Sequence, residues 1–275
     1  MVSGRNRSSG WKHAKLSGHK NEDLVCDLLK TDKAAQNRLK KIAKIEDADF
    51  VDCDSGGLHE KHILSALGGK TANKADITAK FTNGKKIGIS LKKSLRGQAY
   101  LIKPETFIKG IETQYNTTIP ENVKKAILLF WGPVPNIADI TSKYSVNPKN
   151  TALELHKKSL TADTLKRYDE SLYNALIAWF KENIYTITDF CLSKGLALCP
   201  DDSATVIWYK NMLGENDIDD MYNISDLCEK AEARKDMITY STRNGGTTIT
   251  LPFGFVEWHQ GCMQFHHKHE SIAKL

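Results

Sequence analysis

The stretch Ala-Asp-Ile-Thr-Ala-Lys-Phe-Thr at residues 75–82, followed by Asn83-Gly84 and by Ile-Gly-Ile-Ser-Leu-Lys at residues 87–92, decides the fold of this chain. Apolar and polar residues alternate in both segments, and a period of two is the pattern of a β-strand with one buried face. An Asn-Gly pair between two such segments favours a tight turn. The sequence therefore predicts an antiparallel hairpin.

The length of the hairpin loop determines which side chains share a face of the sheet. A two-residue turn at the Asn-Gly pair would place Asp76 on the opposite face from Lys92. A three-residue loop, with Gly84 in the left-handed conformation and a bulge, pairs Asp76 with Ser90 instead. Lys92 then lies on the same face as Asp76. Because a slip of one residue turns every side chain over, we predict the three-residue loop.

Length and composition limit the class of protein. The chain has 275 residues, of which 40% are hydrophobic, and this is ample for a globular core. It contains neither an apolar run long enough to span a membrane nor a signal peptide, so we expect a cytoplasmic protein without a membrane partner. Residues 1–10 are expected to form a flexible basic arm. Six scattered cysteines without a C-x-x-C motif are expected to be buried thiols, neither a disulfide framework nor a zinc knuckle.

Positive charge is concentrated around the hairpin. The formal net charge of +6 is by itself only a mild indication of a polyanionic partner. Eight cations crowd this region, with only Asp76 to offset them: Lys70, Lys74, Lys80, Lys85, Lys86, Lys92, Lys93 and Arg96. A solvated surface would explain such a cluster. One carboxylate placed beside Lys92 favours a cleft that binds phosphates.

Helical spacing of apolar residues predicts helices at 21–29, 34–45, 104–115 and, as one or two helices, at 151–183. Asn21 or Ser17 is expected to cap the first helix, and Pro104 to open the third. Glu22 falls in the first turn of the first helix, where the helix dipole favours an acid.

Strands are expected in the remaining apolar segments, at residues 50–53, 204–209, 237–242, 247–251, 253–258 and 262–267. The continuous apolar run at 125–131 is expected to be a central strand buried on both faces. Residues 93–98 are polar and turn-like. Together these elements predict an α/β fold with a mixed β-sheet core flanked by helices and a strand-rich C-terminal part.

Three further segments carry polar residues without the spacing of a known site. His59 and His62 lack the four-residue spacing of zinc-binding H-E-x-x-H. Gly68-Gly69-Lys70-Thr71 lacks the first glycine of a Walker loop, and we expect its glycines to let the backbone approach a DNA strand. The acidic segment 214–220 lacks the glycine and terminal glutamate of a calcium loop and is expected to be solvated.

The residues of the hairpin match the needs of phosphodiester hydrolysis, which are a hard cation, a positioned water and a charge that offsets the transition state. Asp76 can bind Mg²⁺, with the backbone carbonyl of Leu91, waters and the phosphate completing an oxygen shell. Lys92 can orient or activate the water and compensate negative charge. Ser90 stands where a second carboxylate is expected, and Glu22 can supply that acid from the first helix.

The order Asp76, Ser90, Lys92 resembles the PD-(D/E)xK nuclease motif, in which an Asp precedes a strand that ends in acid-x-Lys. Type II restriction endonucleases of the MspI type are similar, because some of them also replace the acid by a neutral polar residue. Gly18-His19-Lys20-Asn21-Glu22 and Met263-Gln264-Phe265 agree with this resemblance. Ser90 and the absence of a proline before Asp76 depart from the motif and leave the number of metal ions open.

The resemblance implies a Mg²⁺-dependent type II restriction endonuclease. Such an enzyme cuts double-stranded DNA at a short, palindromic sequence and leaves 5′ phosphates. Its partner is a cognate DNA methyltransferase of the same restriction-modification system, with no stable complex expected. A single nuclease domain is expected over residues 11–275, with a catalytic core at about 11–135 and a DNA-recognition part at about 150–275.

DNA contacts are expected from cations near the hairpin and from residues whose donors match base edges. The predicted contacts are Lys20, Lys70, Lys74, Lys93, Arg96, Gln98, Gln264, His266 and His267. Two alternatives stay open at this point. The same fold could serve a repair or junction-resolving nuclease, and Ser90 could mark a DNA-binding protein with a degenerate nuclease site.

Overall fold

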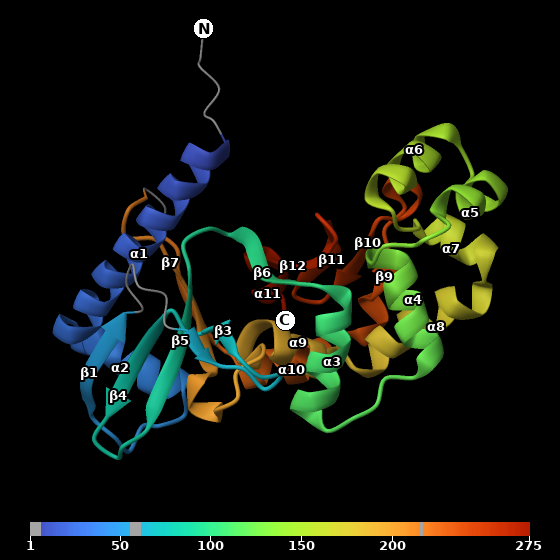
Figure 1. The fold of residues 1–275 in the computed structure, drawn as a ribbon. Helices are drawn as coiled ribbons and strands as arrows, with labels where there is room; N and C mark the ends of the chain where they lie inside the picture. Colours follow the sequence, from blue (N-terminus) through green and yellow to red (C-terminus); the bar gives the residue numbers. More distant parts are fainter. Residues whose placement is uncertain (1–6, 56–61, 215–216) are drawn as a thin grey trace, which may run out of the picture. The chain divides into compact units, whose positions relative to one another are not determined.

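The computed structural model describes residues 7–55, 62–214 and 217–275, with side chains from residue 16 onward (Figure 1). The chain divides into two compact units, Met1–Leu95 with Leu192–Ser225 as unit 1 and Arg96–Cys191 with Asp226–Leu275 as unit 2. This division differs from the sequence-based expectation that the catalytic part ends near residue 135. The chain leaves unit 1 after Leu95 and returns to it at Leu192.

The sheet of unit 1 has the strand order β1-β4-β5-β7-β8. These strands are β1 (Phe50–Ser55), β4 (Ile77–Phe81), β5 (Lys86–Lys92), β7 (Ala204–Lys210) and β8 (Asp219–Asn223). Neighbouring strands are antiparallel except β5 and β7, which are parallel. The prediction of a mixed sheet is therefore confirmed, with β5 at its centre.

The β4–β5 hairpin has the predicted three-residue loop. Ile77 pairs with Ile89, which is the register that a three-residue loop requires, and the N–H of Asp76 donates to the carbonyl oxygen of the same Ile89. The loop closes with a 3.0 Å hydrogen bond from the N–H of Gly84, and Gly84 has a φ of +78°. The left-handed glycine and the register both follow from the parity argument, which the structure confirms.

A second hairpin in unit 1 joins β2 (His62–Leu64) and β3 (Lys70–Ala72). Gly68 and Gly69 form its turn with φ values of +85° and +69°, a conformation that favours glycine. The turn thus accounts for the glycine pair without a close approach of DNA. Of the His59/His62 pair, His62 starts β2, whereas His59 lies outside the described residues.

Two helices, α1 (Arg7–Thr31) and α2 (Lys33–Ile42), pack on the unit 1 sheet. Leu29 of α1 and Leu39 of α2 are buried with Ile89 and Trp208 of the strands. The predicted first helix began too late, because residues 7–20 are polar and show little apolar periodicity. Ser17 and Asn21 are consequently interior positions of α1 rather than caps, and residues 7–10 of the expected arm are helical.

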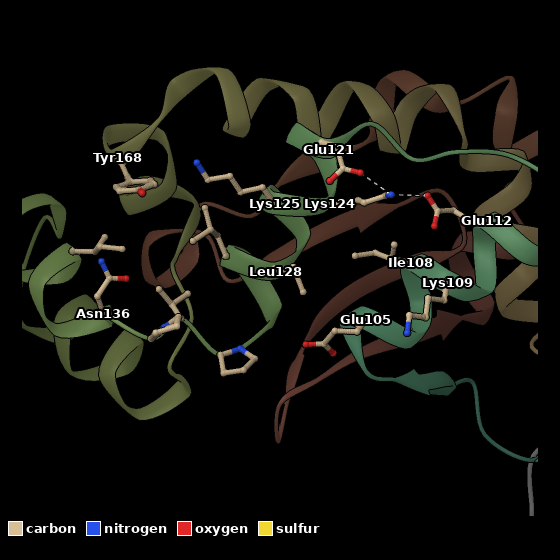
Figure 2. A pocket seen from close by; sticks show the side chains of 15 residues that line it. Glu105, Ile108, Lys109, Glu112, Glu121, Lys124, Lys125, Leu128, Asn136 and Tyr168 are labelled. Carbon is tan, nitrogen blue, oxygen red and sulfur yellow. Dashed lines mark hydrogen bonds and ion pairs between the residues drawn. The ribbon is translucent and has the colours of Figure 1, made fainter. Parts of the chain in front are cut away.

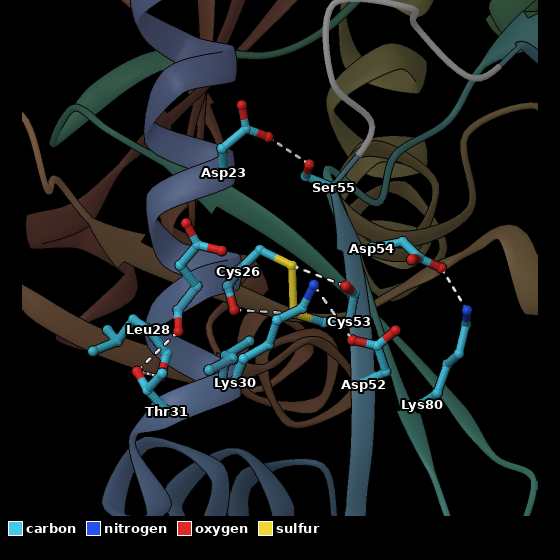
Figure 3. Close-up of a disulfide and its surroundings, with 12 residues drawn as sticks. Asp23, Cys26, Leu28, Lys30, Thr31, Asp52, Cys53, Asp54, Ser55 and Lys80 are labelled. Atoms are coloured by element: carbon cyan, nitrogen blue, oxygen red, sulfur yellow. Dashed lines mark hydrogen bonds and ion pairs between the residues drawn. A yellow bond between two sulfur atoms is a disulfide. The ribbon is translucent and has the colours of Figure 1, made fainter.

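Cys26 of α1 and Cys53 of β1 form a disulfide, with their Cα atoms 6.0 Å apart (Figure 3). Both residues are buried, and ion pairs of Lys30 with Asp52 and of Lys80 with Asp54 lie beside them. The prediction of unpaired thiols was wrong for this pair, because sequence spacing does not show that a helix packs on a strand at these two positions. The expectation of a buried thiol is confirmed for Cys191 and Cys228.

The sheet of unit 2 is antiparallel, with the strand order β6-β12-β11-β10-β9. Its strands are β6 (Arg96–Ile102), β9 (Thr239–Tyr240), β10 (Thr248–Leu251), β11 (Gly254–His259) and β12 (Cys262–Lys268). The strand-rich C-terminal part is confirmed. The expected turn over 93–98 was wrong from Arg96 onward, because Arg96 and Gln98 belong to β6 and pair with β12.

The helices of unit 2 surround an aromatic core in which the rings of Phe107 and Phe265 lie 5.5 Å apart. They are α3 (Pro104–Tyr115), α4 (Glu121–Trp131), α5 (Ile137–Tyr144), α6 (Pro148–Lys157), α7 (Ala162–Tyr168), α8 (Glu170–Glu182), α9 (Ile184–Asp189) and α11 (His269–Ile272). Helix α10 (Ile224–Glu232) begins in unit 1 and continues into unit 2. Short helical segments are η1 (Phe190–Lys194), η2 (Pro200–Asp202), η3 (Lys235–Met237) and η4 (Arg243–Gly245).

The predicted central strand at 125–131 is instead part of helix α4. Pro120 precedes the helix, Glu121 lies in its first turn, and Gly132 follows its last residue. The buried residues of α4 have the spacing of one helical face: Val123, Ala126, Ile127, Phe130 and Trp131. A short apolar run alone does not separate a buried strand from the buried side of a helix.

Unit 2 contains a cavity of about 600 Å³ between α3, α4, α5 and α7 (Figure 2). At one end Lys124 forms ion pairs with Glu112 and Glu121, each at 2.9 Å. Apolar side chains such as Ile108 and Leu128 also line the cavity. None of the predicted site residues lines the cavity.

Among the described residues, no helix is both long and apolar enough to cross a membrane.

Candidate active site

Asp76 directly precedes β4, and the sheet fixes both its backbone and its side chain. Its N–H donates to the carbonyl oxygen of Ile89 at 2.9 Å. Its carboxylate oxygen Oδ2 accepts a 2.7 Å hydrogen bond from the N–H of Leu91. A charge-assisted bond of this kind holds an acid in a defined orientation. Asp76 is therefore directed along β5 at the level of Ser90.

Lys92 ends β5 on the same face as Asp76, as the predicted register requires. Its Nζ donates to Ser90 Oγ at 2.7 Å and lies 3.8 Å from Asp76 Oδ2. Ser90 Oγ is itself 3.5 Å from the same carboxylate oxygen. Ser90 thus lies between the two charged groups. The ammonium is held beside the carboxylate without forming a short ion pair with it.

Glu22 comes to the site from helix α1. Burial raises the pKa of its carboxyl group, and the negative charge of Asp76 raises it further. A hydrogen bond from His19 acts in the opposite direction. The influence of Asp76 on this pKa means that the two acids are close enough to repel each other. The structure therefore brings Asp76, Ser90 and Lys92 into direct contact, and the charge of Asp76 acts on Glu22.

Neighbouring contacts hold the part of α1 that carries Glu22. The buried Asn21 side chain donates to the carbonyl of Lys210 at 2.9 Å and accepts from the N–H of Met212 at 2.7 Å. On the other side of Glu22, Asp23 accepts a 2.6 Å hydrogen bond from Ser55. Together with the disulfide one turn later, these bonds tie α1 to β1 and to the end of β7.

The donor set fits Mg²⁺. Asp76 and Glu22 offer hard carboxylate oxygens, and a divalent cation would relieve the repulsion between them. The carbonyl of Leu91 stays a predicted third ligand. Among the described residues, no group of three or more His, Cys, Asp or Glu side chains is arranged to hold a metal ion. A site built on two carboxylates would leave the remaining positions to carbonyl, water and phosphate oxygens.

The predicted DNA-binding lysines of unit 1 differ in their surroundings. Lys20 and Lys70 are exposed, and Lys74 is half-buried. Lys93 donates to Ser17 Oγ of α1 at 2.5 Å and so helps to hold that helix. The exposed pair is therefore better placed than Lys93 to reach a phosphate.

The expectation that Asp76 alone offsets the lysine cluster was wrong. Lys80 forms an ion pair with Asp54 at 2.6 Å, and this contact raises the pKa of the lysine. Because Asp54 is on β1 and distant in sequence, only the pairing of β1 with β4 reveals the partner. Part of the cluster is therefore neutralised within unit 1.

The other predicted DNA contacts belong to unit 2, where Gln264 Nε2 donates to Gln98 Oε1 at 2.9 Å across β6 and β12. This amide pair is exposed and keeps donors and acceptors suited to base edges. Arg96 forms a 2.7 Å ion pair with Glu270.

The two histidines of β12 point in opposite directions. The ring of His266 stacks on Phe255 at 4.4 Å and lies 3.0 Å from a carboxylate oxygen of Glu257. Burial lowers the pKa of His266. His267 is only 2% exposed. A buried ring does not reach a base edge, so the expectation of a DNA contact is withdrawn for His267.

The expectation that the acidic segment 214–220 is solvated was wrong for Asp219. At the start of β8, its carboxylate accepts 2.7 Å hydrogen bonds from Trp208 Nε1 and Lys210 Nζ, and it also pairs with Arg38. These donors come from α2 and β7, so the sequence around Asp219 gave no sign of them.

Sequence reasoning missed two residues that support the site, His19 and Asn21. His19 is three positions before Glu22, a spacing at which helical side chains meet, so its contact could have been predicted. The partners of Asn21 are almost 190 positions away, and only the fold reveals them.

Comparison with known proteins bears on the fold. No protein-family model matches this chain, and no curated protein matches its sequence. The fold is similar to the crystal structure of the restriction endonuclease MspI in complex with its cognate DNA, with a TM-score of 0.51 and 14% sequence identity. The alignment covers 95% of this chain and 93% of that chain. The chain has a restriction-endonuclease-like fold, which confirms the predicted fold class.

Proposed function

We propose that this protein is a type II restriction endonuclease that hydrolyses phosphodiester bonds of double-stranded DNA with Mg²⁺. The observation that carries the proposal is that Lys92 Nζ lies 3.8 Å from Asp76 Oδ2. In addition, the negative charge of Asp76 raises the pKa of the Glu22 carboxyl group. Two repelling acids beside one lysine are suited to a cation and a phosphate. The similarity of the fold to a DNA-bound restriction endonuclease supports the same function.

Asp76 and Glu22 would hold the cation, together with the backbone carbonyl of Leu91. When bound, Mg²⁺ supplies Lewis-acid polarisation of the scissile phosphate. Lys92 orients the attacking water and offsets the negative charge that develops on the phosphate. The N–H of Leu91 keeps Asp76 in place during this step.

Ser90 has a role that does not require a charge. Its hydroxyl accepts the 2.7 Å hydrogen bond from Lys92 and lies between the ammonium and Asp76. We therefore assign Ser90 the positioning of Lys92. With Ser90 neutral, the negative charge needed for the metal comes from Asp76 and Glu22.

The finer features of the proposal follow from the resemblance of the motif. The enzyme would cut a short, specific sequence in the cytoplasm and leave 5′ phosphates, and a cognate methyltransferase would protect the host DNA. Lys20, Lys70 and Lys74 would contact phosphates, and the Gln98–Gln264 pair would contribute to base recognition.

The substitutions Asp76→Ala and Lys92→Ala test the proposal when cleavage and DNA binding are measured on the same preparations. The wild type should cut supercoiled plasmid into discrete bands with Mg²⁺. Both variants should lose cleavage and keep much of their DNA binding, because each removes a group that acts on the reacting phosphate. Structure-selective nicking by the wild type would instead support a repair or junction nuclease.

The neutral Ser90 favours one alternative, a DNA-binding protein that does not cleave. In that case the wild type would be silent on every DNA with either Mg²⁺ or Mn²⁺. The Asp76→Ala variant would then bind DNA at least as well as the wild type, because it removes a negative charge near the phosphates.

A further inference from the structure

His19 contacts one of the proposed metal ligands. Its Nδ1 lies 3.1 Å from Glu22 Oε2, and the two side chains are 12% and 15% exposed. The residues are three positions apart on α1, so the helix itself brings them together. The resemblance of the motif and the comparison of folds assign no role to this histidine.

Glu22 needs such a partner because its surroundings act against a fixed orientation. Its side chain has three rotatable bonds, and the negative charge of Asp76 repels it. Repulsion between two like charges does not by itself hold a carboxylate in one orientation. A ligand that must be reoriented for each binding event binds a cation less tightly than one already in place.

The geometry also indicates which ring nitrogen carries the proton. A proton on Nε2 would set the lone pair of Nδ1 against a carboxylate oxygen of Glu22 at 3.1 Å. His19 Nε2 is buried and has no hydrogen-bond partner among the described residues, so a proton there would leave a buried donor unsatisfied. A proton on Nδ1 makes the contact a hydrogen bond to the ionised acid.

We propose that His19 is a positioning residue, which holds the Glu22 carboxylate toward Asp76 through its Nδ1–H and so prepares the site for a divalent cation. The inference rests on the proposed function, since it assigns Glu22 to the metal. Residues that hydrogen-bond to a metal ligand in this way typically contribute about 10- to 100-fold to metal affinity.

Two substitutions separate the hydrogen bond from the bulk of the side chain. His19→Phe keeps a ring of similar shape but removes the donor. His19→Asn is smaller, but its amide nitrogen stands as many bonds from the backbone as Nδ1 and can donate to Glu22. Melting curves of both variants show whether the fold is kept.

The readout is binding of Mn²⁺ to the full-length protein without DNA, measured by calorimetry or electron paramagnetic resonance. His19→Phe should weaken Mn²⁺ binding by about tenfold or more, close to the loss in Glu22→Gln. His19→Asn should recover most of that loss. The double variant His19→Phe/Glu22→Gln should bind no more weakly than Glu22→Gln, because His19 acts through Glu22.

Three results would overturn the inference: wild-type affinity in His19→Phe, no recovery in His19→Asn, or additive losses in the double variant. Cleavage measured in parallel keeps this outcome distinct from that of the proposed function. If Mn²⁺ binding by the wild type depends on Glu22 and on the donor of His19 but the wild type cuts no DNA, the function fails and the positioning role stands. If the wild type cuts DNA and His19→Phe binds Mn²⁺ normally, the positioning role fails alone.

Discussion

Two carboxylates on the unit 1 sheet, Asp76 and Asp219, have opposite surroundings. Asp219 accepts from Trp208 and Lys210 at 2.7 Å and also pairs with Arg38. Asp76 accepts a hydrogen bond from a backbone N–H at 2.7 Å, and the ammonium of Lys92 lies 3.8 Å from the same carboxylate oxygen. One acid is surrounded by positive charge, whereas the other has a second acid for a neighbour.

The pKa shifts in these two regions have opposite signs. Burial would raise the pKa of Asp219, but hydrogen bonds from its three donors outweigh burial and lower it. Burial and the charge of Asp76 raise the pKa of Glu22. The folded protein therefore stabilises the negative charge at Asp219 and leaves negative charge in excess at the Asp76–Glu22 pair. An acid of the first kind supports the fold, and a pair of the second kind is suited to a cation.

Matched substitutions should separate these roles, and the largest effect is expected at Asp76. Asp76→Asn keeps the size of the side chain but removes one charge from the proposed metal site. Because a bound metal ion lowers the barrier by several kcal/mol, cleavage should fall on the order of 10³-fold. The measurement is the initial rate of plasmid cleavage with Mg²⁺, with thermal melting as the control. A variant that keeps the wild-type rate would remove Asp76 from the site.

Asp219→Asn should instead reduce stability. The amide cannot pair with Arg38 and Lys210, so two partly buried cations lose their counter-charge. The expected loss is about 2–3 kcal/mol in the free energy of unfolding. Urea denaturation checks this value, and the cleavage rate below the melting temperature should stay near that of the wild type. A stable Asp219→Asn protein with impaired cleavage would reverse the assignment of the two acids.

The dependence of this loss on pH follows from the lowered pKa of Asp219. A lowered pKa means that the carboxylate stabilises the fold above its unfolded pKa, and that this contribution is lost as the pH falls through the folded pKa. The difference between the wild type and Asp219→Asn should therefore be full at pH 7 and shrink below about pH 4. Denaturation curves at pH 7, 5 and 3 give the test, and a difference that grows on acidification would contradict it.

Glu22→Gln should have a smaller effect of the opposite sign. A raised pKa means that the folded state disfavours the ionised carboxyl group, so the charge destabilises the protein at neutral pH. Without metal, the variant should be more stable than the wild type by less than about 1 kcal/mol. Added Mg²⁺ should raise the melting temperature of the wild type more than that of the variant. Equal shifts with Mg²⁺ would exclude Glu22 as a ligand.

The weakest expected effect concerns the lysines. Each phosphate contact should contribute about −0.9 to the log-log slope of DNA affinity against salt. Lys70→Ala should reduce the slope by about one contact, because Lys70 is exposed. Lys80→Ala is the control, since Asp54 already pairs with this lysine. Identical slopes for the wild type and Lys70→Ala would mean that Lys70 belongs to a solvated surface.

The sequence was informative where a short-range rule determines the geometry. The hairpin register followed from alternation and one glycine, and it correctly predicted the three-residue loop and the placement of Lys92 beside Asp76. Pro104 correctly marked the start of α3. In these cases the information lies within a few residues of the feature.

Features that depend on packing between distant segments could not be predicted. The run at 125–131 has the composition of a buried strand, but its apolar side is one face of α4. The disulfide between Cys26 and Cys53 and the three donors of Asp219 likewise depend on how helices pack on the sheet. Glu22 is an intermediate case, because the proposed chemistry predicts a second acid and the charge of Asp76 acts on this residue of α1, while its role as a metal ligand stays a prediction.

The most direct test of the central claim is to digest one long DNA with the purified wild type and Mg²⁺ and to map the ends. The Asp76–Glu22–Lys92 site predicts discrete fragments whose ends share one short sequence and carry 5′ phosphates, and no product for Lys92→Ala under the same conditions. Equal cleavage by the wild type and Lys92→Ala would contradict the assignment of this site, and intact DNA with both Mg²⁺ and Mn²⁺ would contradict the assignment of nuclease activity.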